Sequence, residues 1–134
     1  MPGEPRYFTV EEANEVLPAV RVFMERIQGH RVTLADAQAE HAELAQQIAG
    51  NGGDLSPHEV AEVQGRVEGE AAAIARCIEG IQELGGMVKD LDTGLVDFLH
   101  QRQGEDVLLC WRMGEEEITH WHGLEEGFAG RKPR

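Results

Sequence analysis

The chain has 134 residues, of which 41% are hydrophobic and only 5% aromatic. This length suits a single domain over residues 1–134, with a helical part at 9–86 and a β-rich part at 87–131. The formal net charge is −13, and a surface this acidic repels phosphate groups, which argues against binding to nucleic acid or to an anionic membrane.

The N-terminus and the two cysteines bear on where the protein is expected to work. The first residues, MPGEPRYFTV, lack the apolar core of a signal peptide. No stretch is long and apolar enough to cross a bilayer. Cys77 and Cys110 have no metal-type spacing and form no CxxC motif. We therefore expect a cytoplasmic protein in which both thiols are reduced and buried.

A first helix is predicted directly after Thr9. Thr9 and Glu12 form a capping box, in which each side chain can bond to the backbone N–H of the other residue. Pro18 interrupts the pattern, because it lacks a backbone donor and its ring clashes with the preceding turn. We therefore expect a short N-terminal helix that kinks or breaks at residues 16–17, followed by a longer helix over 18–49.

The middle of the chain predicts two long helices joined by a short loop. Mostly apolar residues recur at intervals of three and four, the spacing of one helix face. They are Leu17, Val20, Met24, Ile27, Leu34, His41, Ala45 and Ile48, then Val60, Val63, Val67, Ile74, Cys77, Ile81, Leu84 and Val88, with Glu70 as a polar exception. Gly50 to Gly53 suit the loop, Ser56 with Glu59 suits a cap, and Gly85-Gly86 suits a stop. This pattern predicts a long antiparallel helical hairpin.

The apolar stripe of this hairpin is wider than one helix pair covers. Val22, Phe23, Val32 and Ile78 lie beside the seam and widen it. We therefore expect the stripe to meet a further neighbour, which could be the β-rich part, the short first helix or a second copy of the chain. A homodimer is the hypothesis that follows from the last of these.

The β-rich part is predicted to be a small three-stranded antiparallel meander. Apolar residues, many of them β-branched or aromatic, dominate three short segments. The strands are expected at Leu95–Leu99, Val107–Trp111 and Ile118–His122. Gly104 and Gly114 suit the turns between them. Together with the hairpin, the meander predicts an α+β fold.

Two histidines of the third predicted strand form a candidate metal site. His120 and His122 lie two residues apart, so both imidazoles would point to one face of a strand. This spacing suits zinc or iron with a carboxylate as third ligand, for which Asp92 is a candidate. The alternative is an exposed strand end with one histidine packed beside Trp121. A divalent metal is the one cofactor that the sequence suggests.

Asp97 is flanked by apolar residues inside a predicted strand. Its carboxylate must therefore face solvent or have a partner. Arg112 and Arg131 are the nearby basic candidates. One interpretation is a structural clamp, in which Asp97 pairs with an arginine or with backbone and fixes the meander on the helices.

The other interpretation is a ligand pocket around the same aspartate. Asp97, His122 and Arg131 are charged or titratable residues among the largest apolar ones of this part, and Arg131 could bind a carboxylate or phosphate bidentately. The walls of such a pocket would be Trp111, Trp121 and Phe128. The sequence leaves the clamp and the pocket as alternatives.

Four segments resemble the bacterial family catalogued as domain of unknown function 2203. They are YFTVEEANEVLP near the start, then KDLDTGLVDF, LLCWRMGE and ITHWHGLEEGFAGR. The family pattern matches Asp90, Asp92, Gly94, Asp97, Phe98, Trp111, Gly114, Glu115, Trp121, His122, Gly127, Phe128, Gly130 and Arg131, while His120 lies outside it. The family has no established activity to carry over.

Two functional hypotheses follow. The first is a homo-oligomerising assembly or interaction module, in which the hairpin drives homodimerisation and the meander presents a surface. The alternative is a small-ligand or metal-binding domain, with hydrolysis as one form of activity, that uses the polar residues of the meander. Whether the protein is an enzyme stays open at this point.

Overall fold

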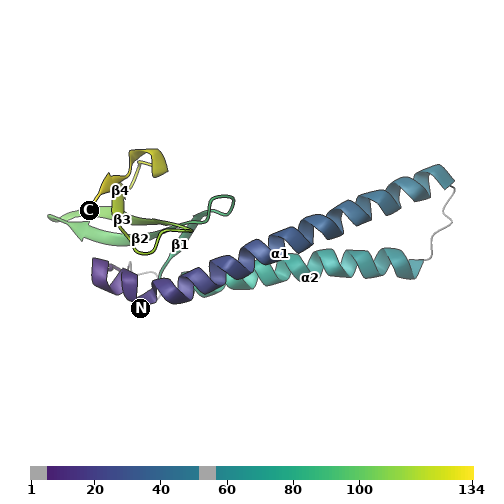
Figure 1. The fold of residues 1–134 in the computed structure, drawn as a ribbon, viewed down its shortest axis with the longest axis horizontal. Helices are drawn as coiled ribbons and strands as arrows, with labels where there is room; N and C mark the ends of the chain where they lie inside the picture. The colour runs from purple at the N-terminus through teal and green to yellow at the C-terminus, as the bar shows by residue number, and fades with distance from the viewer. Residues whose placement is uncertain (1–5, 52–56) are drawn as a thin grey trace. The chain divides into compact units, whose positions relative to one another are not determined.

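The computed structural model describes residues 6–51 and 57–134, and Figure 1 shows its ribbon. The elements are α1 (Val10–Asn51), α2 (Pro57–Glu83), β1 (Met87–Asp90), β2 (Leu95–Arg102), β3 (Glu105–Arg112), β4 (His120–Gly123), the 3-10 helix η1 (Phe128–Gly130) and β5 (Lys132–Pro133). The predicted α+β class is confirmed. In the described part of the chain, no helix is long and apolar enough to cross a membrane.

The chain divides into two compact units, and both helices contribute to each. Met1–Met24 together with Ile78–Arg134 form the sheet unit, and Glu25–Cys77 form the hairpin unit. The sheet unit contains the whole sheet, the start of α1 and the end of α2. The hairpin unit contains only the remaining parts of the two helices.

The capping box at the start of α1 is confirmed. The Thr9 N–H donates to Glu12 Oε1 at 2.9 Å, and the Glu12 N–H donates to Thr9 Oγ1 at 3.0 Å. The bond from the Thr9 backbone, with that to its hydroxyl, lowers the pKa of Glu12, because it favours the charged carboxylate.

The predicted break at Pro18 is wrong, because α1 runs through it as one helix. A proline costs a helix interior about 3 kcal/mol. Burying one aliphatic side chain contributes about 1.5–3 kcal/mol. Around Pro18 the residues Ala13, Leu17, Val20 and Met24 are each at most 2% exposed. Packing of this face therefore outweighs the proline, and the expected short N-terminal helix is simply the beginning of α1.

Within the hairpin unit the two helices run antiparallel, as predicted (Figure 1). The buried residues along the seam of this unit are Ile27, Ala37, Val63, Ile74 and Cys77. Farther toward the loop the predicted seam is exposed, including His41, Ala45 and Ile48. The expected loop residues at 52–53 and the Ser56 cap lie outside the described residues.

Two polar bridges join the helices of the hairpin unit. His30 Nδ1 lies 2.6 Å from Glu70 Oε2. Glu70, the polar residue in the predicted apolar seam, therefore has a hydrogen-bonding partner. Arg66 lies 2.8 Å from Glu40 in a more exposed pair. The exposed Arg66–Glu40 pair stabilises the hairpin only slightly, because such ion pairs contribute about 0–1 kcal/mol.

The predicted glycine stop ends α2. Gly85 has φ +98°, and the N–H of Gly86 donates to the carbonyl of Ile81 at 3.0 Å, as in a glycine C-cap. A Cβ on Gly85 would lie only 2.2 Å from Phe8 Cζ. Val88, expected as the last seam residue of α2, instead lies in β1, because the helix has already ended.

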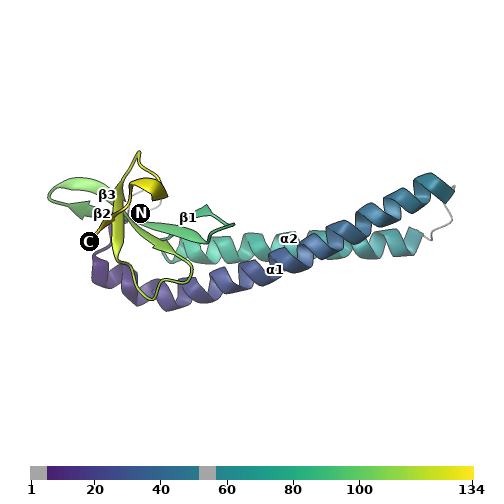
Figure 2. The same ribbon diagram turned by 45° about the horizontal axis from the view of Figure 1, so that its top comes forward.

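The sheet has five antiparallel strands in chain order, β1-β2-β3-β4-β5, so the predicted three-stranded meander is incomplete. The three expected strands correspond to β2, β3 and β4. Figure 2 shows the first three strands side by side. The edge strands β1 and β5 have four and two residues, too few to give a periodic signal of their own.

Two details of the sheet have local causes. β2 and β3 are joined by the two-residue turn Gln103-Gly104, with φ of 53° and 82°, the geometry that matches strand twist. β4 begins at His120 rather than at the expected Ile118, because the Ile118 N–H donates to the side chain of Asn14 on α1 at 2.8 Å instead of to a strand.

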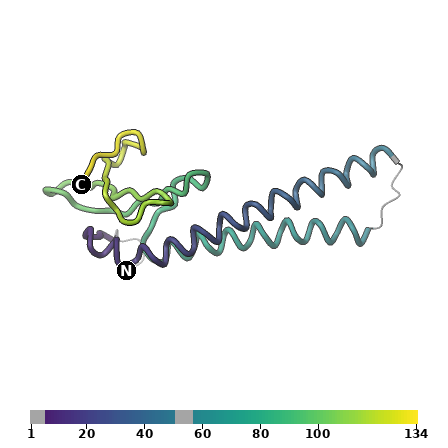
Figure 3. Tube along the Cα trace, viewed as in Figure 1, coloured from purple at the N-terminus to yellow at the C-terminus, as the bar shows by residue number. Residues whose placement is uncertain are grey.

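The sheet has two covered faces. On one face, Val96 and Phe98 of β2 pack toward the start of α1 and the end of α2, where the Phe8 and Phe98 rings meet edge to face at 5.2 Å. On the opposite face, residues of the segment after β4 line a pocket together with residues of β2 and β3. This segment is drawn in yellow in the trace of Figure 3. This second face carries the polar residues of interest.

Candidate metal centre

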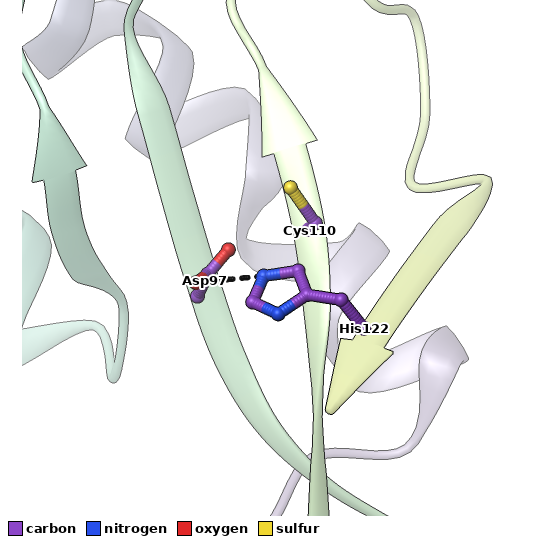
Figure 4. A group of neighbouring side chains, drawn as sticks. All are labelled: Asp97, Cys110 and His122. Atoms are coloured by element: carbon purple, nitrogen blue, oxygen red, sulfur yellow. Dashed lines mark hydrogen bonds and ion pairs between the residues drawn. The ribbon is translucent and has the colours of Figure 1, made fainter. Parts of the chain in front are cut away.

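Three side chains of metal-ligating type share the face of the sheet under the C-terminal segment (Figure 4). Asp97 of β2 pairs with Cys110 of β3, and His122 of β4 pairs with Leu108. Directly opposed residues of antiparallel strands share a face, as do residues two apart on one strand. Asp97, Cys110 and His122 therefore project to the same side, and each is at most 3% exposed.

These side chains are close enough to hold one ion together. His122 Nε2 lies 3.1 Å from Asp97 Oδ2. One ligand atom from each of Asp97, Cys110 and His122 lies within 4.8 Å of the other two. Over residues 6–51 and 57–134 no other set of three metal-ligating side chains meets this condition.

The ring of His122 is oriented by its other nitrogen. Nδ1 lies 2.9 Å from the carbonyl oxygen of Gly123, which can only accept, so Nδ1 carries a hydrogen. In the neutral ring, Nε2 then has no hydrogen, and its lone pair points at the carboxylate of Asp97. Two acceptors facing each other are favourable only when a proton or a metal cation lies between them.

The second oxygen of Asp97 also indicates a bound cation. Oδ1 is buried, and among the described residues it has no hydrogen-bond partner. An unpaired buried carboxylate oxygen costs free energy, so each such atom requires an explanation. A cation at this position would satisfy it.

Cys110 is unreactive without such a cation. Burial, with a contribution from the Asp97 carboxylate, raises the pKa of the Cys110 thiol to about 12. At neutral pH the thiol of the metal-free protein is therefore protonated, which argues against a nucleophilic thiolate. A coordinating metal ion reverses this, because it deprotonates the thiol that binds it.

The three side chains line part of a pocket of about 250 Å³. Its other lining residues are Lys89, Leu95, Leu108, Leu124, Glu126, Gly127 and Phe128. The pocket thus has a polar base on the sheet and mostly apolar walls. The carboxylate of Glu126 accepts hydrogen bonds from the Lys132 ammonium and from the Gly123 N–H, both at 2.8 Å. These two bonds lower the pKa of Glu126.

Arg131 is bound elsewhere than predicted. Its guanidinium donates to both carboxylate oxygens of Glu115, at 3.0 and 2.8 Å, and lies 4.6 Å from the ring centre of Phe128. In the described chain no hydrogen bond joins it to Asp97 or His122. The structure therefore brings Asp97 and His122 together but gives Arg131 a different carboxylate.

Only one of the three expected aromatic walls lines the pocket. Phe128 does. Trp111 pairs with Val96 and Trp121 pairs with Leu109, so both indoles project from the opposite face of the sheet. The Trp111 Nε1–H donates to the carbonyl of Glu115 at 2.9 Å.

Two of the expected metal ligands are not part of the cluster. His120 Nδ1 lies 2.8 Å from the Thr119 hydroxyl. Asp92 is exposed in the turn between β1 and β2. Cys110, which the sequence indicated only as a core thiol, takes the third place instead. Cross-strand register alone could have identified it, since neither cysteine has a ligand-type spacing.

The comparisons with known proteins give a family and no activity. A family model described as "Uncharacterized conserved protein (DUF2203)" matches residues 6–134, which confirms the resemblance. No curated protein matches the chain, and no solved structure does.

Replacing Asp97 with Asn separates a cation site from a structural ion pair. The Asn amide can donate to the Nε2 lone pair of His122 without any added proton or metal. We therefore expect the metal-free Asp97→Asn protein to be at least as stable as the wild type, with any loss below about 0.5 kcal/mol in urea unfolding. A loss of about 1–3 kcal/mol would instead identify a clamp that depends on the charge.

Proposed function

The chain belongs to the uncharacterized DUF2203 family, and because that description names no activity, we propose a function from the site itself. The protein binds a divalent transition metal through Asp97, Cys110 and His122. The observation that carries this proposal is the buried group of three ligand atoms within 4.8 Å of one another. The hypothesis of a metal-binding domain is kept, with a different set of ligands.

The donor set favours zinc. A carboxylate oxygen, a thiolate sulfur and an imidazole nitrogen are all ligands that Zn²⁺ accepts in tetrahedral sites. Metal-binding histidines commonly donate their other N–H to a carbonyl or carboxylate, which fixes the ring. The bond from His122 Nδ1 to Gly123 O has this form.

The site also leaves one position for a further ligand. Three protein ligands and an open fourth position are typical of catalytic zinc sites, whereas structural sites have four. The pocket adjoins all three proposed ligands. A water bound there would be the nucleophile of a hydrolytic reaction, which is the enzymatic form that this proposal allows.

The surroundings of the site fit a reducing compartment. Both Cys77 and Cys110 are free thiols. A thiol needed as a metal ligand must be kept from oxidation, as it is in the cytoplasm. We therefore include a cytoplasmic location in the proposal.

Metal analysis of protein purified without a histidine tag tests the proposal. After dialysis against zinc and removal of the excess, we expect the wild type to retain one zinc ion per chain. Cys110→Ala and His122→Gln should lose it, because each removes one of only three protein ligands. Cys77→Ala is the matched control, since it removes the other buried thiol. Zinc retained by Cys110→Ala, or none in the wild type, would contradict the proposal.

A second function is proposed for the hairpin unit, namely self-association with another copy of the chain. Residues of both its helices line an open pocket of about 460 Å³. The residues that line it are Gln38, His41, Ala42, Gln64, Val67 and Glu68. Elsewhere on α1, Val32 is 64% exposed. A second hairpin could cover these surfaces in a four-helix arrangement.

Sedimentation at micromolar concentration tests self-association. We expect a dimer that strengthens with added salt, because the net charge of −13 makes two copies repel each other. Ala42→Glu, inside this open pocket, should weaken the dimer, whereas Gln47→Glu, on another face of α1, should not. A 14.8 kDa monomer at every salt concentration would rule the dimer out.

A further inference from the structure

We infer that the pocket over the metal site binds a small aliphatic carboxylate, with its carboxylate on the open metal position and its chain against the apolar walls. This inference rests on the proposed metal site and adds the class of ligand. Three features carry it: the charge balance of the pocket, its apolar walls and its size.

The charge balance favours an anion. A divalent cation with the carboxylate of Asp97, the thiolate of Cys110 and the neutral ring of His122 has no net charge. Glu126 is balanced by Lys132, whose ammonium lies 2.8 Å away. The remaining charge in the pocket is the ammonium of Lys89.

Lys89 is placed to meet a ligand. It lines the pocket together with the proposed ligands, from the position in β1 between Val88 and Asp90 where the register against β2 shifts. It is exposed, and within the described residues no hydrogen bond or ion pair to its ammonium group occurs. An anion bound to the metal would then lie near a second positive charge, the ammonium group of Lys89.

The apolar walls of the pocket favour a ligand that carries a hydrocarbon chain on its anionic group. Leu95 and Leu108 line the pocket from the sheet, and Leu124 and Phe128 line it from the segment after β4. Leu124 is 55% exposed and Phe128 is 36% exposed. Hydrocarbon in the pocket would cover these surfaces and gain free energy by burial.

The size and the donors argue against larger or more highly charged ligands. A volume of about 250 Å³ lies below the range of roughly 300–1,000 Å³ that holds drug-sized ligands. Phosphate groups are usually held by several donors, arginine above all. Arg131 is already bound to Glu115 at 2.8 Å. One lysine and one metal position suit a single carboxylate better.

Calorimetric titration of the zinc-loaded protein with hexanoate tests the inference. We expect saturable binding to the zinc-loaded protein and none to the metal-free protein. Acetate should bind at least about tenfold more weakly, because it lacks the methylene groups that contact the walls. Hexylamine should not bind, because its charge is reversed.

The variant Lys89→Gln should weaken hexanoate binding about fivefold, as expected for a partly exposed ion pair. Arg102→Gln is the matched control, because it removes the same charge from the opposite face of the sheet, where Arg102 lies 4.6 Å from the Trp121 ring. Zinc content is measured for each protein before titration.

The outcomes separate the two proposals. A protein that takes up no zinc contradicts the metal site and, with it, this inference. A protein that is fully loaded but binds hexanoate no better than acetate or inorganic phosphate keeps the metal site and overturns the ligand class. Equal weakening by Lys89→Gln and Arg102→Gln would also overturn the placement of the ligand beside Lys89.

Discussion

Strand β3 imposes the constraint on which the sheet unit depends. Its five consecutive residues Val107–Trp111 are all buried, so both faces of the sheet must be covered there. The start of α1 and the end of α2 cover one face. The segment after β4, with Leu124 and Phe128, borders the pocket on the other. A strand covered on both faces keeps Asp97, its neighbour on β2, away from water, and a dry carboxylate requires a partner.

Much of the fold could be predicted because its signals are local. The Thr9–Glu12 capping box, the Gly85 stop and the turn at Gly104 each act within a few residues, and all three are confirmed. The continuity of α1 through Pro18 could not be predicted, because it depends on tertiary packing that overrides a local preference. The edge strands β1 and β5 were missed because pairing, not composition, makes such short segments strands.

In the candidate site, too, features with a local sequence signal could be predicted, whereas features that depend on strand pairing could not. The sequence indicates Asp97 because a carboxylate inside an apolar strand is unusual, and the structure brings it to His122, 25 positions away in the sequence. Cys110 was missed because its place in the cluster depends on the register of β2 against β3, which no spacing in the sequence records. Arg131, one of two arginines that the sequence offers as partners for Asp97, pairs with Glu115 instead, and in a chain with many acids the sequence alone does not select this partner.

X-ray absorption at the zinc edge of the loaded protein tests directly whether Asp97, Cys110 and His122 hold one metal ion. We expect one sulfur scatterer at about 2.3 Å with nitrogen and oxygen at about 2.0–2.2 Å. The sulfur contribution should vanish in Cys110→Ala and remain in Cys77→Ala. Coordination by nitrogen and oxygen alone in the wild type, or a sulfur that survives in Cys110→Ala, would show that these three residues do not hold the ion.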